Sequence, residues 1–141
     1  MKLQPTEHQL QASLCEYLDR ALRPELEYRA IPNGGKRHIG VARKLKREGV
    51  RAGTPDIFIM LPEGRIAWLE LKIKGGYLSA DQKAFRDKAI SLDHAWGMAR
   101  TLDEAIEFLR VIGALRRQHK TDCAYHLDQY EQECTCKDAL K

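Results

Sequence analysis

The sequence predicts a single α/β domain built around a mixed sheet of about four strands. Helical and strand-like patterns alternate in the order α, β, α, β, β, α, β, α, which is typical of helices packed on a sheet. The 141 residues, 43% of them hydrophobic, suffice for one core and are too few for two ordinary domains. We expect this domain to cover residues 1–115 and a polar tail to cover 116–141.

The first half of the domain is expected to hold two helices and one strand. Residues 6–9 have the form of a capping box, a Thr and a Gln that satisfy unpaired N–H groups at a helix start. Apolar residues then recur at helical spacing over residues 10–21. Residues 27–31 form a short strand pattern, and residues 38–48 form a second helical pattern. The core-facing residues expected in that second helix are Ile39, Ala42 and Leu45.

The second half is expected to begin with a hairpin of two strands, at residues 57–61 and 65–73. Both strands are apolar on both faces, which indicates the covered centre of a sheet. Capping-box patterns at 79–82 and 101–104 predict two more helices, and residues 95–99 form a short strand between them. The core-facing residues expected in these helices are Phe85, Ala89, Leu92, Ala105, Ile106, Leu109 and Ile112.

Three charged residues interrupt the apolar hairpin. Glu70 and Lys72 lie two apart, so they share one face of the second strand, and Asp56 directly precedes the first strand. If the strands pair, the carboxylates of Asp56 and Glu70 approach one another and repel unless a cation lies between them. Carboxylates suit Mg²⁺, and a nearby lysine can orient a water or stabilise charge on a phosphoryl group. The alternative, a turn residue and two edge charges, would place unpaired charges among apolar neighbours.

A third carboxylate is directed toward the same interior. At about 100° per residue, Glu7 falls within about 40° of the centre of the apolar stripe of the first helix, whereas Glu16 points to the far side. We therefore expect Glu7 to face inward at the start of this helix and Glu16 to face water.

Five motifs follow one another along the chain. Pro55-Asp56 is followed, after thirteen residues, by Glu70-Leu71-Lys72. The other stretches are TEHQLQASLCEYL around Glu7, Asn33-Gly34-Gly35, GVRAGTPD at 49–56 and LSADQ at 78–82. Together they resemble the VRR-NUC domain (virus-type replication and repair nuclease) of the PD-(D/E)XK nuclease superfamily. The resemblance covers about residues 5–109.

The resemblance implies an αβββαβ restriction-endonuclease-like core and metal-dependent hydrolysis of DNA phosphodiester bonds. The Mg²⁺ or Mn²⁺ ligands that it implies are Glu7, Asp56, Glu70 and the backbone carbonyl of Leu71. Lys72 would orient the attacking water. Gln82 matches a glutamine near the active site, and its alternative role is to cap a helix.

The resemblance also concerns the substrate and the assembly. Stand-alone members of this size, often from bacteriophages, resemble Holliday-junction resolvases and act as homodimers. The resemblance therefore implies structured or branched DNA, such as four-way (Holliday) junctions, as the substrate, in replication, recombination or repair. A symmetric junction needs two cuts related by a two-fold axis, which suits a dimer. The alternative from another class is a non-catalytic nucleic-acid-binding module that recruits a replication or repair complex.

Positive charge is concentrated in the middle of the chain. Residues 119–141 carry three Lys against five Asp and Glu, so the first 118 residues carry +6 where the whole chain carries +4. The run between residues 36 and 51 is typical either of a footprint on a phosphate backbone or of a solvated helix face. The expected DNA-binding residues are Lys36, Arg37, Arg43, Lys44, Lys46, Arg47 and Arg51.

The C-terminal stretch holds three of the four cysteines. Cys123, His126, Cys134 and Cys136 offer four ligands to a structural zinc ion, with His119 as a spare ligand. The alternatives are a flexible tail with reduced thiols, or a C-terminal helix used in dimer contacts. The fourth cysteine, Cys15, lies in a helical apolar pattern and is expected to pack against the core.

The chain has no stretch of about 18 apolar residues that could span a membrane. Its first residues, MKLQPTEHQ, lack the apolar run of a signal peptide. A cytoplasmic protein, in a bacterium or a phage-infected host cell, is therefore expected.

Overall fold

Four strands form one mixed sheet in the order β1-β2-β3-β4 in the computed structural model, which describes residues 5–32 and 39–116. The strands are β1 (Glu27–Ala30), β2 (Ile57–Met60), β3 (Ile66–Leu71) and β4 (Ala95–Ala99). The first three are antiparallel to one another in turn, and β4 runs parallel to β3. A parallel pair needs a crossover connection, which here contains one helix. The α/β class and the mixed four-stranded sheet predicted from the sequence are confirmed.

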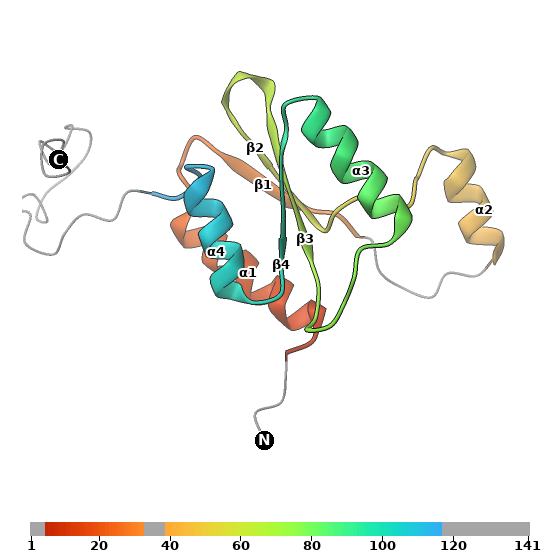
Figure 1. Ribbon diagram of the computed structural model, residues 1–141, viewed down its shortest axis with the longest axis horizontal. Helices are drawn as coiled ribbons and strands as arrows, with labels where there is room; N and C mark the ends of the chain where they lie inside the picture. Colours follow the sequence, from red (N-terminus) through yellow and green to blue (C-terminus); the bar gives the residue numbers. More distant parts are fainter. Residues whose placement is uncertain (1–4, 33–38, 117–141) are drawn as a thin grey trace, which may run out of the picture.

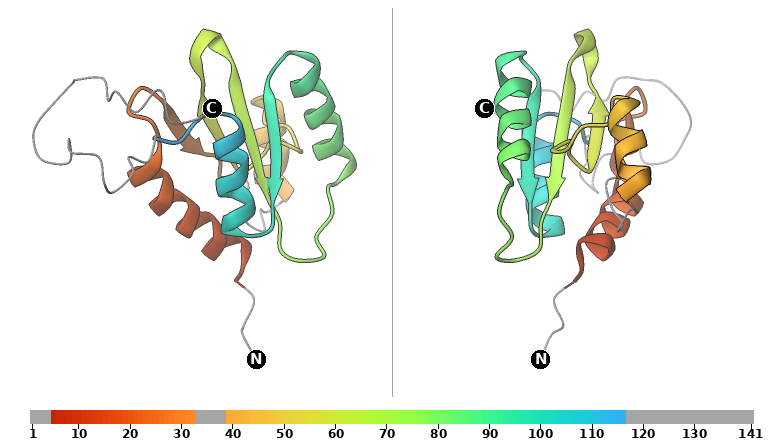
Figure 2. Two further views of the ribbon diagram at one scale, coloured as in Figure 1. Left: turned by 60° about the vertical axis from the view of Figure 1, so that its left-hand side comes forward. Right: turned by 90° about the vertical axis from the view of Figure 1, so that its right-hand side faces the viewer.

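Helices cover both faces of this sheet. The helices are α1 (Glu7–Ala21), α2 (Ile39–Arg47), α3 (Ala80–Ser91) and α4 (Leu102–Val111). Helices α1 and α4 lie together on one face and α3 lies on the other, whereas α2 projects away from the sheet (Figures 1 and 2). A short 3-10 turn, η1 (Pro62–Gly64), joins β2 to β3. No helix in the described part of the chain is long and apolar enough to cross a membrane.

The main core lies between the sheet and the pair of helices α1 and α4. Leu10, Leu14 and Leu18, which recur every four residues along α1, form its buried stripe. The sheet contributes Ile57, Ile59, Ala67, Leu69 and Leu71, and α4 contributes Ala105 and Leu109. Because successive side chains of a strand point to opposite faces, the even-numbered residues of β3 must face α3.

Aromatic side chains hold α3 against that second face. The ring of Trp68 on β3 lies 5.7 Å from Phe58 on β2 and 4.9 Å from Phe85 on α3, in an edge-to-face arrangement with Phe85. The guanidinium of Arg86 lies over the ring of Trp96 on β4. These contacts stabilise the position of α3 beyond the burial of its surface alone.

Two of the three predicted capping boxes are complete, those of Thr6 with Gln9 and of Ser79 with Gln82. The third is half formed. The hydroxyl of Thr101 accepts from the backbone N–H of Glu104, but Glu104 Oε2 accepts from Arg100 N at 2.7 Å, one residue before the cap.

Two predictions of burial are wrong. Helix α2 has no buried residue, and Ile39 is 70% exposed, because this helix does not pack on the sheet. The expectation that Ile39, Ala42 and Leu45 face the core therefore fails. Leu92 is 55% exposed because it is the cap that ends α3, where the backbone has already left the helical path.

The close packing of β4 on α4 gives a test of the fold. A Cβ added to Gly97 would lie 2.5 Å from the Phe108 ring, so Gly97→Ala should destabilise the protein by about 1–3 kcal/mol in urea unfolding. The matched control is Gly40→Ala in α2, where an added Cβ meets nothing within 4 Å. Equal midpoints for the two variants would contradict this packing.

Candidate active site

The predicted carboxylates gather where β3 ends. In the antiparallel register, Ile57 pairs with Leu69, so Asp56 lies opposite Glu70. Asp56 Oδ2 accepts a hydrogen bond from Leu71 N at 2.8 Å, and the Asp56 carbonyl accepts from Ile31 N at 2.7 Å. Backbone groups of β3 and of the residue after β1 therefore fix the position of Asp56.

Glu70 is a charged residue that is buried in the described part of the chain, with 2% of its surface exposed. Its Oε1 lies 2.6 Å from Lys72 Nζ and 2.5 Å from Gln82 Nε2. Burial raises the pKa of the Glu70 carboxyl above its ordinary value, and the charges of Asp56 and Glu7 raise it further, against the opposing effect of Lys72. The Glu70 carboxylate is thus a strong acceptor that needs positive charge beside it.

Lys72 supplies that charge. Burial lowers the pKa of the Lys72 ammonium, but Glu70, Glu7 and Asp56 outweigh burial and raise the pKa above its ordinary value. Lys72 therefore stays protonated at neutral pH and can donate hydrogen bonds but not accept a proton. Its backbone N–H donates to Ala99 O at 3.0 Å, which continues the parallel ladder of β3 and β4 past the strand end.

Glu7 approaches the site from the first turn of α1. Its Oε1 accepts from Ile73 N at 3.3 Å, and its charge acts on both Glu70 and Lys72. The residue is exposed, and its hydrogen bond with Ile73 N places it beside the end of β3 and not in the core. The expectation that Glu7 faces inward is therefore corrected to a position on the rim. Glu16 is exposed, as expected.

Gln82 performs two tasks at once. Its Oε1 accepts from Ser79 N at 2.9 Å and completes the capping box of α3, while its Nε2 donates to Glu70. The capping role and the site role, which the sequence presents as alternatives, thus coexist in one side chain. The start of α3 and the buried carboxylate are held by the same amide.

Sequence reasoning missed two contacts that support this arrangement. Gly53 has φ +88°, and a Cβ there would lie 2.5 Å from the backbone of Asp81, so only glycine lets the loop before Asp56 pack on the start of α3. Arg100 donates from Nη2 to Gly76 O at 3.0 Å, and Gly76 packs beside the Lys72 side chain. A glycine within the GVRAGTPD stretch is a local signal from which the first contact could have been predicted. No local signal indicated the second contact.

The structure qualifies the predicted metal site. No group of three His, Cys, Asp or Glu placed to hold a metal ion occurs within residues 5–32 and 39–116. The predicted three-carboxylate site is therefore not preformed: Lys72 and Gln82 bind Oε1 of Glu70, and Leu71 N binds Oδ2 of Asp56. The chemistry of the donors still fits a hard divalent cation, because the charges of all three carboxylates act on the Lys72 ammonium.

The predicted DNA-binding residues are only partly described. Arg43, Lys44, Lys46 and Arg47 lie on the exposed helix α2, where Lys44 forms an ion pair with Glu48 at 3.8 Å. Arg51 donates to Lys46 O at 2.9 Å and helps to end this helix. Lys36 and Arg37 lie outside the described residues.

The predicted zinc ligands Cys123, His126, Cys134 and Cys136, with His119, also lie outside the described residues. The zinc site stays a prediction. Cys15 is half-buried and packs against the core, and burial raises the pKa of its thiol. This thiol is therefore held mainly in its protonated, less reactive form.

The fold is similar to that of a solved structure. This chain superimposes on a VRR_NUC domain protein with a TM-score of 0.62 and 22% sequence identity, over 77% of this chain and 88% of that chain. No family model and no curated protein matches the sequence. The likeness shows a shared fold, and it confirms at the level of fold what the sequence motifs indicated.

The pair of Lys72 with Glu70 gives a second test. Lys72→Met leaves a buried carboxylate without its cation and should cost about 3 kcal/mol of stability at pH 7, measured by urea unfolding with EDTA. A carboxyl whose pKa is raised in the folded state destabilises the fold as pH rises through that pKa. The deficit of the variant should therefore shrink as the pH falls below the raised pKa of the Glu70 carboxyl.

The control is Lys83→Met, which removes an exposed lysine of the same helix that carries Gln82. A deficit that is equal for the two variants, or independent of pH, would show that the Lys72 charge does not stabilise Glu70.

Proposed function

We propose that this protein is a divalent-metal-dependent endonuclease of the VRR-NUC family that hydrolyses DNA phosphodiester bonds. The observation that carries the proposal is a buried carboxylate, Glu70, bound to a protonated lysine, with Asp56 and Glu7 acting on both. A chain gains no stability from such a group compared with apolar residues, so a chemical role accounts for it better. The fold shared with a VRR_NUC domain protein supports the same conclusion.

The proposed ligands of Mg²⁺ or Mn²⁺ are Glu7, Asp56, Glu70 and the carbonyl of Leu71. When bound, the metal ion would supply an activated water and stabilise charge on the phosphoryl group. Gln82 holds the Glu70 carboxylate in place through its amide, and the hydrogen bond from Leu71 N orients Asp56.

Lys72 acts in this proposal as a donor and not as a base. Its raised pKa keeps the ammonium charged at neutral pH, so it can orient the attacking water and stabilise negative charge that develops on the scissile phosphate. Gly76 lies beside the alkyl part of the Lys72 side chain, where an added Cβ would come within 3.3 Å of Lys72 Cδ.

The proposed substrate is structured or branched DNA such as a four-way junction, and the proposed assembly is a homodimer, with roles in replication, recombination or repair. Helix α2 supports DNA as the substrate, because it exposes Lys and Arg side chains that can contact phosphates without reading bases. The two-fold symmetry of a junction supports the dimer. Both parts rest on the sequence resemblance and are separate from the chemistry proposed above.

The catalytic proposal predicts metal-dependent cleavage. Linear, flap, single-stranded and four-way-junction DNAs, incubated with Mg²⁺ or Mn²⁺, should include at least one substrate that is cut, and EDTA should abolish the cut. Asp56→Ala, Glu70→Ala and Lys72→Ala should each reduce the rate by about 10²-fold or more.

Lys83→Ala is the matched control and should cut at the wild-type rate. If none of the DNAs is cut but some are bound, the protein is a non-catalytic binding module and the enzyme proposal fails. If Asp56→Ala cuts as well as wild type, cleavage comes from another source.

The proposed role of α2 predicts a change in salt dependence. Neutralising Arg43, Lys44, Lys46 and Arg47 together should lower DNA affinity and reduce the slope of log K against log [salt] by about 0.9 for each phosphate that the variant can no longer neutralise. Fluorescence anisotropy with EDTA present measures binding without cleavage. Neutralising Lys83 and Lys88 on α3 is the control, and equal slopes in both variants would contradict the role of α2.

A further inference from the structure

A second charged region lies at the opposite end of α1 from Glu7. It is a pocket of about 510 Å³ between the C-terminal ends of α1 and α4. Arg20, Arg110 and Arg116 line it, together with Tyr17 and Leu115, and we call it the arginine pocket. None of the described residues that line it is acidic. The nuclease chemistry proposed above makes no use of this pocket.

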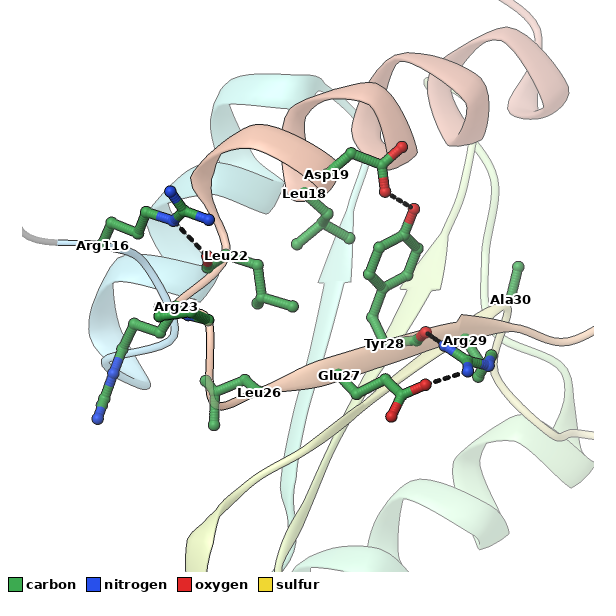
Figure 3. Close-up of a pocket in the computed structure, with 11 residues that line it drawn as sticks. Leu18, Asp19, Leu22, Arg23, Leu26, Glu27, Tyr28, Arg29, Ala30 and Arg116 are labelled. Carbon is green, nitrogen blue, oxygen red and sulfur yellow. Dashed lines mark hydrogen bonds and ion pairs between the residues drawn. The ribbon is translucent and has the colours of Figure 1, made fainter. Parts of the chain in front are cut away.

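The walls of the arginine pocket are fixed by backbone hydrogen bonds. Arg116 N donates to Ala21 O at 2.8 Å, and Arg23 N donates to Ala114 O at 3.0 Å. Leu22 and Leu115 form a β-bridge between the same two segments. Arg116 also folds back over the end of α1, where its Nε donates to Leu22 O at 2.9 Å (Figure 3). The site is therefore organised before any ligand arrives, which reduces the entropy lost on binding.

A neighbouring pocket of about 410 Å³, which also includes Arg116, differs in charge. There Arg29 pairs with Glu27, and the Tyr28 hydroxyl donates to Asp19 Oδ1 at 2.6 Å, as Figure 3 shows. Arg23, which also lines it, pairs with Glu25. The charges of Arg23 and Arg29 in that pocket are thus compensated by carboxylates close to them.

The arginine pocket keeps a positive excess. Arg110 pairs with Glu107, but Arg20 and Arg116 donate only to backbone carbonyls among the described residues. Each of the two helix C-termini contributes about half a negative charge. Three guanidiniums, one carboxylate and two helix ends leave a net charge of about +1, beside the apolar surface of Tyr17 and Leu115. The pocket therefore suits an acidic segment that also carries apolar or aromatic side chains.

We propose that the occupant is residues 121–136 of this same chain. This stretch, TDCAYHLDQYEQECTC, contains four Asp and Glu, no Lys or Arg, two Tyr and one Leu. It follows directly from the pocket wall, because only residues 117–120 separate it from Arg116. A linker of this length spans about 10–12 Å on average, which gives an effective concentration on the order of millimolar. Even weak charge complementarity then suffices for occupancy.

Amide hydrogen exchange of the full chain tests this proposal. In low salt and with EDTA, so that bound zinc cannot order the tail, the amides of residues 121–136 should exchange at least about fivefold more slowly than in a free peptide. Arg20→Gln with Arg116→Gln should remove this protection, and so should about 0.5 M salt. Lys83→Gln with Lys88→Gln, an equal change of charge on α3, should leave it intact.

A tail-side variant keeps the test decisive if the arginine variant unfolds. Asp128→Asn with Glu131→Gln changes the proposed occupant alone and should also remove the protection. Free-peptide exchange rates in the native chain, or wild-type protection in the tail-side variant, would overturn the proposal. The measurement is repeated as the protein concentration is raised about fortyfold. If protection increases with concentration, a second copy supplies the segment, and this result also overturns the proposal.

Discussion

The structure depends on the burial of one carboxylate. Glu70 lies within a four-stranded sheet with 2% of its surface exposed, and an isolated charge there would cost several kcal/mol. Two neighbours stabilise this charge. Lys72 places an ammonium beside it, and Gln82 donates a hydrogen bond from its amide. The start of α3 must therefore lie where the Gln82 amide can reach Glu70. Gly53 is needed as well, so that the loop before Asp56 can pack on the backbone of Asp81.

One face of β3 packs in the main core, and the other carries the candidate site. Ala67, Leu69 and Leu71 face the main core against α1 and α4, whereas Trp68, Glu70 and Lys72 face α3 or the rim. Strand alternation permits this division without any irregularity in the backbone. As a consequence, the Glu70 side chain of the candidate site projects from a strand, β3, that is mostly buried. Its carboxylate projects from the same face of the same strand as the Trp68 ring, which packs on Phe85.

The chain separates its charges over the length of α1. Glu7 stands at the first turn, beside two further carboxylates, and Arg20 stands at the last turn, beside two further arginines. At 1.5 Å per residue these groups are about 20 Å apart, well beyond the screening length at physiological salt. The cation proposed at one end and the acidic segment proposed at the other are therefore too far apart to interfere with each other. The helix dipole favours both placements, a carboxylate in the first turn and an arginine in the last turn.

The sequence by itself determined the order of the elements, the strand pair at the centre of the sheet, two complete capping boxes and the alternation that puts Glu70 and Lys72 on one face. Each of these follows from contacts between residues close in sequence, or from the period of apolar side chains.

The tertiary structure decided the rest. Helix α2 showed an amphipathic pattern, but no residue in the described part of the chain packs over Ile39 closely enough to bury it, and Leu92 ends its helix facing water. The pattern indicates which face of a helix could be buried and not whether a partner exists.

Long-range contacts were decided in the same way. Only the packing of α3 on the sheet brings Gln82 to Glu70, and only the approach of residues about 90 positions apart forms the arginine pocket. Lys72 binds Oε1 of Glu70, an oxygen that was expected to bind a metal ion. This contact depends on distances of a few ångströms across the site. Local periodicity carries no information about such pairs, because they form only when the whole chain has closed around its core.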